Sequence, residues 1–254
     1  MINLKSKLSK QELSIGSWIT LAHPAIAEIM SNAGFDWLVV DLEHSVISLR
    51  EAEELIRTIE LSGVVPLVRL TSNNPDQIKR VMDAGAHGII VPMVNSVESA
   101  MKAVNHVKYP NVGVRSFGLA RAQKYGVEFH EYMNWQQDNT VVIVQIEHIK
   151  AVRKVRDILN VDGVDGFIIG PYDLSGSMGI PGQFDHPDFL KAIKTITKAA
   201  KELQKPGGIH VVEPNPEELS NAIDQGHNFI AYSVDIRMLD NMCRDVFIKT
   251  QILK

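Results

Sequence analysis

DWLVVDLEHS, residues 36–45, is an apolar run that ends abruptly in acids and a histidine. Residues 36–43 have the near-continuous apolar character of a β-strand that is buried on both faces. Asp41, Glu43 and His44 stand at its carboxyl end with no turn residue between them. Because buried charges cost free energy unless they are paired, this strand end indicates a function as well as a fold.

The same arrangement repeats along the chain. Short apolar runs alternate with segments whose apolar residues recur at helical spacing, as in Ile26, Ile29, Met30 and Ala33. We predict strands over residues 14–21, 36–43, 64–70, 87–94, 140–147, 166–173, 206–212 and 228–235.

Capping signals mark the helix boundaries between these strands. Ser48 and Glu51 have the spacing of a capping box, and prolines 24, 75, 187 and 216 stand where first helical turns are expected. Buried strands alternating with one-faced helices predict a parallel sheet covered by helices, and eight such repeats predict an α/β fold, the (β/α)₈ TIM barrel. An open, doubly wound sheet is the alternative.

Two segments interrupt the alternation. Residues 111–139 and 174–185 show no sustained period, and long irregular segments inside a compact domain are usually functional. Neither has the composition of a linker, so we expect a single domain over residues 1–254.

Composition excludes several classes of protein. The chain is 45% hydrophobic and 22% charged, as in an ordinary globular domain. A net charge of −4 without a basic stripe argues against nucleic acid as a partner. The absence of a long apolar run argues against a membrane partner or a signal peptide, and predicts a cytoplasmic protein. Cys243 is the only cysteine, which excludes an internal disulfide framework and Cys-based zinc sites.

Polar residues gather at the predicted strand ends, which in a TIM barrel surround the active site. These residues are Asp41, Glu43, His44, Arg69, Gln145, Glu147, Asp173, His210 and Asp235. Taken singly, each has a structural explanation: Asp235 could cap a helix, His210 could be a hydrogen-bonded core histidine, and Arg69 could close a salt bridge. Taken together, on consecutive strands, they predict one polar pocket.

Glu147 and Asp173 lie one βα unit apart, so both carboxylates can face one cation. Two carboxylates with water and substrate suit magnesium or manganese. Glycoside hydrolysis is an alternative for two facing acids, although aromatic platforms for sugar are few. No lysine stands at a strand end, which argues against a Schiff-base aldolase, and no nucleotide-binding glycine motif is present.

Longer motifs identify a family. DLEHS, PLVRL, MDAGAHGIIVPMV, GVRSFGLARAQKYG, VQIE and GFIIGPYDLSGSMG, in this order and over nearly the whole chain, resemble the HpcH/HpaI aldolases, metal-dependent class II pyruvate aldolases that include 2-dehydro-3-deoxyglucarate aldolase. The resemblance implies an aldehyde-lyase that reversibly cleaves a 2-keto-3-deoxy (4-hydroxy-2-oxo) acid to pyruvate and an aldehyde through a metal-bound enolate. It implies Mg²⁺ or Mn²⁺, or else Co²⁺, and no organic cofactor.

The resemblance also implies residue roles. Glu147 and Asp173 would hold the metal, Arg69 would contact the keto oxygen, and Gln145 would lie near the metal. His44 would transfer protons, with Asp83 paired to it, and Arg121 would contact the substrate. The backbone of GPYD would hold the pyruvate carboxylate, through Gly170, Pro171, Tyr172 and Asp173. Tyr172 departs from the small residue that is frequent at this place in the family.

Chain direction raises a question about assembly. Helices of a TIM barrel run away from the catalytic face, so Asp83 and the segment 111–139 should emerge at the opposite end. We therefore expect them to act in the pocket of a neighbouring subunit, the alternative being that the segment climbs its own barrel. The family resemblance implies a homohexamer, and the apolar stretch 236–254 is expected to pack on another subunit.

Other functions remain open from the residues alone. A citrate-lyase-β-like acyl thioester lyase or a decarboxylase would use the same enolate chemistry. A non-enzymatic barrel that serves only binding or assembly is the third alternative.

Overall fold

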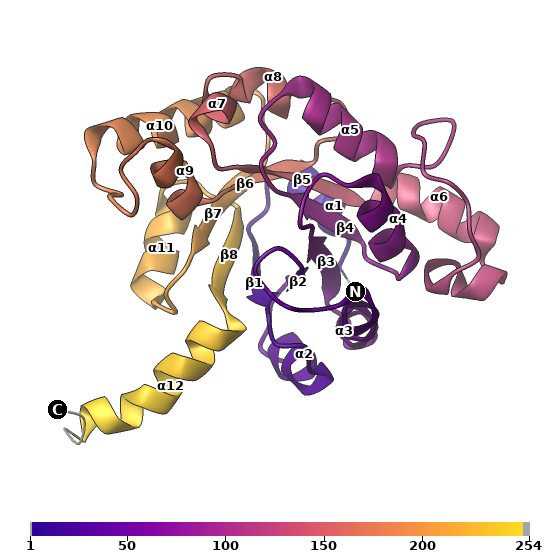
Figure 1. Ribbon diagram of the computed structural model, residues 1–254, viewed down its shortest axis with the longest axis horizontal. Coiled ribbons are helices and arrows are strands. Elements are labelled where there is room, and N and C mark those ends of the chain that lie inside the picture. The colour runs from indigo at the N-terminus through magenta and orange to yellow at the C-terminus, as the bar shows by residue number, and fades with distance from the viewer. Residues whose placement is uncertain (1, 251–254) are drawn as a thin grey trace.

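The structure, a computed structural model, describes residues 2–250. Eight parallel strands follow one another in sequence order and close into a barrel (Figure 1), which confirms the predicted fold. The strands are β1 Ser14–Ile19, β2 Trp37–Asp41, β3 Val65–Arg69, β4 Gly88–Val91, β5 Val141–Ile146, β6 Gly166–Ile169, β7 Gly207–Val211 and β8 Phe229–Val234.

Helices cover the barrel and begin where the capping signals predict. Pro24, Pro75, Pro187 and Pro216 open their helices, and the capping box of Ser48 and Glu51 is formed. The helices are α1 Leu4–Ser9, α2 Pro24–Ser31, α3 Leu49–Leu61, α4 Pro75–Asp83, α5 Val97–Val107, the 3₁₀ helix η1 Arg121–Gly126, α6 Phe129–Asn139, α7 Ile149–Val152, α8 Val155–Leu159, α9 Pro171–Ser177, α10 Pro187–Glu202, α11 Pro216–Asp224 and α12 Asp235–Lys249.

Two predicted boundaries are wrong. Residues 129–139, expected to be irregular, form α6, whose buried residues include the polar Gln136, so the apolar period is weak. The sixth strand, expected to reach residue 173, ends at Ile169. Pro171 then opens α9, because its fixed φ and missing N–H suit a first helical turn better than a strand interior.

Apolar residues form two layers. One fills the space between barrel and helices, and the other fills the barrel itself, where Trp37 stacks on Phe229 at 4.3 Å between ring centroids. Leu4 and Leu8 of α1 belong to this inner layer. Because α1 precedes β1 in the chain, its packing closes the amino-terminal end of the barrel and leaves the carboxyl end open.

The last helix leaves the barrel. Figure 1 shows α12 extending away from the strands at the end of β8. Its exposed apolar side chains are Ile236, Leu239, Met242, Val246, Phe247 and Ile248. Of the stretch expected to pack on another subunit, residues 251–254 lie outside the described part. Between residues 2 and 250, no helix combines the length and the apolar composition needed to cross a membrane.

Candidate active site

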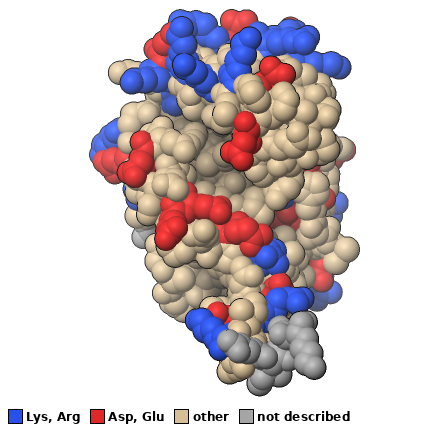
Figure 2. All heavy atoms as spheres, turned by 90° about the vertical axis from the view of Figure 1, so that its left-hand side faces the viewer, with Lys and Arg blue, Asp and Glu red and all other residues tan. Residues whose placement is uncertain are grey.

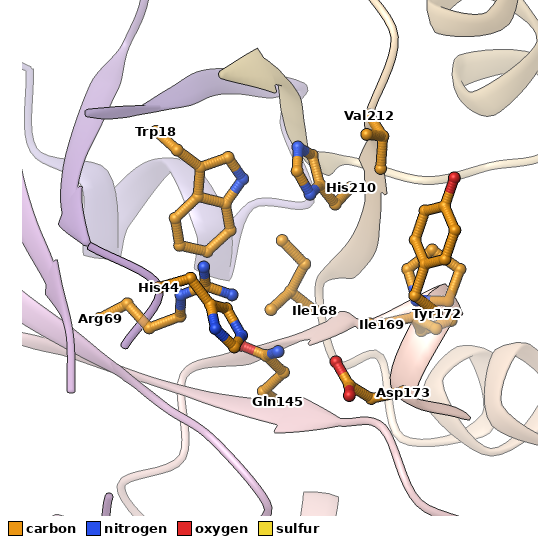
Figure 3. A pocket seen from close by; sticks show the side chains of 12 residues that line it. Trp18, His44, Arg69, Gln145, Ile168, Ile169, Tyr172, Asp173, His210 and Val212 are labelled. Carbon is orange, nitrogen blue, oxygen red and sulfur yellow. The ribbon is translucent and has the colours of Figure 1, made fainter. Parts of the chain in front are cut away.

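A cavity of about 340 Å³ opens at the carboxyl ends of the strands. Figure 2 shows this side of the molecule, hollowed near its centre, with acidic side chains beside the hollow and Lys and Arg gathered mainly at the top. The lining residues, most of them labelled in Figure 3, are Trp18, His44, Arg69, Gln145, Ile168, Ile169, Gly170, Pro171, Tyr172, Asp173, His210 and Val212.

A buried ion pair orients Arg69. Strand register places Asp41 of β2 directly beside Arg69 of β3. Asp41, 1% exposed, accepts hydrogen bonds from Nε of Arg69 at 2.8 Å and from Nη2 at 2.6 Å. The guanidinium also lies 4.2 Å from the ring centroid of Trp18. This bidentate geometry and the stacking hold the guanidinium in one orientation and leave Nη1 without a bond to any described residue, so it is available to a ligand.

Glu147 is almost fully buried beside the cavity. One carboxylate oxygen accepts a hydrogen bond from the backbone N–H of Met93 at 2.6 Å, and the other accepts one from the Gln145 side-chain amide. Met93 has a φ of 53°, a costly conformation for a non-glycine residue. Burial, together with the smaller effects of the nearby Glu43 and Asp173 carboxylates, raises the pKa of Glu147 to about 7.

Glu43 is the second acid with an altered pKa. Burial raises its pKa to about 7, against the lowering effect of Arg69, and Asp41 and Asp173 raise it. Its Oε2 is 3.5 Å from Nε of Arg69 and 3.7 Å from Nε2 of His44. This buried oxygen makes no hydrogen bond within residues 2–250.

These acids fit a divalent cation. The Glu43 and Asp173 carboxylates raise the pKa of Glu147, and the Asp173 carboxylate raises the pKa of Glu43. A cation among these carboxylates would reverse that effect. A Cβ at Gly170 would lie 2.8 Å from Oε2 of Glu147, so glycine leaves space there. No cluster of three or more His, Cys, Asp or Glu side chains in the described chain is arranged to hold a metal by itself. Two carboxylates with water and substrate, as the sequence predicts for Glu147 and Asp173, would be enough for Mg²⁺ or Mn²⁺.

The segment after β2 and the start of α9 also contribute to the cavity wall. His44, with a side chain 61% exposed, stands at the mouth. The start of α9 brings Gly170, Tyr172 and Asp173 into the wall. Pro171 also lines it but has no N–H, so the backbone donors that this segment can offer a ligand belong to Gly170, Tyr172 and Asp173.

Asp83 and Arg121 are not among the described residues that line this cavity. Arg121 donates hydrogen bonds to the Ala84 carbonyl oxygen at 3.0 Å and to Glu60. Asp83, at the end of α4, lies 3.9 Å from Arg115, and burial raises its pKa. Both residues therefore lie away from the pocket of their own chain, as chain direction predicts.

The structure adds residues that the sequence analysis did not select. These are Trp18 and Val212, whereas His210, which also lines the cavity, was already among the polar strand-end residues predicted to form one pocket. Trp18 could have been found, because it stands near the carboxyl end of the first predicted strand. Asp41 was noted at a strand end, but its pairing with Arg69 depends on the register between two strands.

Comparisons with known proteins identify the family of this chain. The model of the HpcH/HpaI aldolase/citrate lyase family matches residues 14–241. The chain is 35% identical over 242 residues to 2-dehydro-3,6-dideoxy-6-sulfogluconate aldolase from Pseudomonas putida, covering 95% of this chain and 94% of that one. It is 36% identical over 236 residues to hydroxypyruvate/pyruvate aldolase from Sagittula stellata, covering 92% of each chain. The crystal structure of an HpcH/HpaI aldolase from Desulfitobacterium hafniense superposes with a TM-score of 0.92 at 30% identity, covering 100% of this chain and 98% of that one.

Proposed function

This chain belongs to the HpcH/HpaI aldolase/citrate lyase family, and on that premise we propose that it is a divalent-metal-dependent aldolase. It would reversibly cleave a 4-hydroxy-2-oxo acid, such as a 2-keto-3-deoxy acid, into pyruvate and an aldehyde. The observation that carries the proposal is the pairing of opposite charges around one cavity. Arg69, held by Asp41, has one free guanidinium nitrogen and lines the same cavity as Asp173. The buried Glu147 carboxylate lies beside that cavity, next to Gly170.

The proposed reaction breaks the bond between C3 and C4 of the substrate. His44 accepts the proton of the C4 hydroxyl, the C3–C4 bond breaks, and its electron pair delocalises onto the keto oxygen as the aldehyde leaves. Arg69 donates a hydrogen bond to that oxygen where negative charge develops, which is commonly the largest single contribution to rate. A proton then returns to C3 and gives pyruvate.

The acids serve binding in this proposal. Glu147 and Asp173 would hold Mg²⁺ or Mn²⁺, which supplies an electrophile for the carboxylate and keto oxygens of the substrate. Gln145 keeps one Glu147 oxygen oriented, and Met93 keeps the other. Glu43 would hold a water molecule or the His44 ring with its unpaired oxygen. Gly170, Tyr172 and Asp173 would border the pyruvate carboxylate.

The preferred aldehyde depends on a different part of the cavity wall. The relatives named above act on different acids, so their names support only the class of 4-hydroxy-2-oxo acids. Tyr172 is 56% exposed at the cavity wall and packs edge-on against Phe184, with ring centroids 5.1 Å apart. A large side chain at this place would narrow the side on which the aldehyde leaves.

We also propose that the active enzyme is an oligomer, a hexamer by family resemblance, with pockets at subunit interfaces. Exposed apolar side chains on α12 and on residues 112–127 support an interface, because a monomer rarely exposes so many. Asp83 lies beside the second of these surfaces, and its Oδ1 is buried without a hydrogen bond within residues 2–250. Arg121 is less suited to reach a neighbour, because Glu60 and Ala84 already engage its guanidinium.

Pyruvate release tests the proposed activity. A panel of 4-hydroxy-2-oxo acids is incubated with the enzyme after EDTA treatment, with and without added Mg²⁺ or Mn²⁺. We expect metal-dependent release, and we expect Glu147→Gln to lose it together with the metal-dependent exchange of the C3 protons of pyruvate. Glu12→Gln, at an exposed acid near the opposite end of the barrel, is the control. Equal rates in EDTA, or normal exchange in Glu147→Gln, would contradict the assignment.

A further inference from the structure

The chemistry proposed above assigns no substrate contact to one wall of the cavity. Trp18 of β1 and His210 of β7 line it side by side, with ring centroids 5.5 Å apart. Figure 3 shows the indole nitrogen of Trp18 on the edge that faces His210, with Tyr172 and Asp173 on other sides of the cavity. The two rings come from strands that are far apart in sequence and become near neighbours through the closure of β1 on β8.

The tautomer of His210 follows from its partner. Nε2 lies 3.1 Å from the carbonyl oxygen of Ser233, and a carbonyl only accepts, so Nε2 carries the proton. Nδ1 is then a hydrogen-bond acceptor and has no partner in the described part of the chain. Burial, with a smaller effect from Arg69, lowers the pKa of His210 to about 4, so the ring stays neutral at physiological pH.

The backbone of Ser233 positions its carbonyl oxygen to accept this hydrogen bond. Its φ of 51° is unusual for a serine, and its carbonyl oxygen also accepts a hydrogen bond from the Ser17 hydroxyl at 3.3 Å. The left-handed conformation at the end of β8 turns the carbonyl toward the barrel interior. His210 is therefore held in one orientation by strained, buried backbone.

Trp18 supplies the complementary group. Its side chain is nearly buried, and its indole N–H, a donor only, makes no hydrogen bond to any of residues 2–250. A buried hydrogen-bond donor without a partner costs free energy. The Trp18 N–H and the unpaired Nδ1 of His210 therefore indicate a ligand that bonds to both.

We propose that Trp18 and His210 together bind a hydroxyl group of the substrate. A hydroxyl accepts from the Trp18 N–H while it donates to Nδ1 of His210, which satisfies both groups at once. A carboxylate accepts but cannot donate, and a methyl group does neither. This inference rests on the proposed aldolase function and adds the class of substrate, one hydroxylated next to a reacting carbon.

That hydroxyl has two chemical sources. It is either the 3-hydroxyl of a hydroxylated keto acid or the 2-hydroxyl of the aldehyde. Rates of aldol formation with two pairs of substrates distinguish these sources. The first comparison pairs hydroxypyruvate with pyruvate at one fixed aldehyde. The second pairs glycolaldehyde with acetaldehyde at fixed pyruvate. In the wild type we expect at least about a tenfold preference in kcat/KM for the hydroxylated member of one pair, because a site with paired polar groups rejects the analogue that leaves them unpaired.

His210→Leu tests the assignment directly. We expect the preference within that pair to fall by about tenfold or more, since the acceptor is lost. His227→Leu is the matched control, because His227 is also a buried histidine but lies outside the cavity. Its ratio should equal that of the wild type. Aldol activity with no hydroxyl preference, or with an unchanged ratio in His210→Leu, overturns the inference and leaves the proposed function intact. Absence of aldol activity with every pair overturns both.

Two amide variants separate substrate binding from support of Ser233. An asparagine amide lies where Nδ1 of histidine lies, whereas a glutamine amide reaches the place of Nε2. We expect His210→Asn to restore part of the hydroxyl preference and His210→Gln to restore less. The reverse order would show that the bond to Ser233 is the whole function of His210. Trp18→Phe, which keeps the ring on Arg69 and removes the donor, should lower the same ratio.

Discussion

Asp41 shows how a single buried carboxylate can organise a site without touching the substrate. It accepts two hydrogen bonds from Arg69 and one from the Glu43 backbone at 3.0 Å. A buried carboxylate is stable only when such donors surround it. The same contacts therefore stabilise Asp41, aim the Arg69 guanidinium and shape the loop that carries Glu43 and His44.

Arg69→Lys tests how much the bidentate guanidinium geometry contributes to catalysis. Lysine keeps the positive charge but offers no planar fork, so it cannot bind Asp41 through two nitrogens and still present a third to the keto oxygen. We expect kcat for pyruvate release to fall by about 10²- to 10³-fold, with metal binding retained. Steady-state kinetics and metal titration measure the two effects. Arg57→Lys, on the outer helix α3, should behave as wild type, and a wild-type kcat in Arg69→Lys would make Arg69 purely structural.

At the scale of elements, the packing of β1 against β2 requires a glycine at position 16. A Cβ on Gly16 of β1 would lie 2.0 Å from the indole of Trp37 on β2, which is fully buried. Glycine therefore leaves the space in which Trp37 stacks on Phe229. This close approach helps to close β1 against β2 and to keep the inner layer filled.

Gly16→Ala should be costly for this reason. Overpacking a rigid core typically costs about 1–3 kcal/mol, and here the neighbour is a ring that is packed on its other face as well. We expect a lower free energy of unfolding in urea. Gly176→Ala in α9, where a Cβ meets nothing within 4 Å, is the control and should change stability by less than about 0.5 kcal/mol. Equal stability of both variants would contradict the packing argument.

A buried lysine joins the end of α6 to the end of α5. Nζ of Lys108 donates to the carbonyl oxygens of Gln136 at 2.8 Å and Gln137 at 3.0 Å, and to the Thr140 hydroxyl at 2.8 Å. These acceptors form the carboxyl end of α6, where a cation is favourable. Burial nevertheless lowers the pKa of Lys108 to about 8, and Lys5 adds to the lowering.

The lowered pKa predicts a pH dependence. The folded state releases this proton near pH 8 and the unfolded chain near the ordinary pKa of 10.5, so the unfolded state binds more protons between them. The contribution of Lys108 to stability is thus present above about pH 10 and is lost as pH falls through about 8. Between pH 7.5 and 9.5, wild type should gain about 1–2 kcal/mol relative to Lys108→Met, measured by urea unfolding. Parallel curves for the two proteins would contradict it.

At the scale of the whole molecule, the barrel carries apolar surface that its own chain does not cover. Val127, Leu119 and Phe117 are exposed near Asp83 and η1. Helix α12, which carries further exposed apolar residues, extends away from the barrel (Figure 1). Asp83 lies outside its own pocket, although the family motif that contains it is expected to serve an active site. An interface that brings Asp83 to a neighbouring pocket would explain both features.

Mixed oligomers test this arrangement. His44→Ala and Asp83→Asn are each expected to be inactive, because each lacks one part of every pocket. If Asp83 serves a neighbour, subunit exchange between them creates some pockets with both residues intact, and activity should reappear. Exchange is verified by mass labelling of one partner. Proven exchange without recovery would place Asp83 and His44 in the service of the same chain's pocket.

The sequence by itself determined the barrel and the side of it that is functional. Alternation of buried strands with one-faced helices is a local property, and so are the prolines that open helices and the polar residues that end strands. Prediction from the sequence failed where local signals conflict. Helix α6 was missed because its buried Gln136 weakens the apolar period, and the sixth strand was predicted too long because the apolar run before Pro171 continues into a helix.

Only the tertiary structure decided which residues meet. Asp41 pairs with Arg69 through the register of β2 and β3, Arg121 is engaged by Glu60, and His210 stands beside Trp18. These partnerships join residues that are about 30 to 190 positions apart in the sequence. Strand register, barrel closure and the packing of η1 bring them together, and those depend on the summed burial of the whole chain, which no local pattern of residues records.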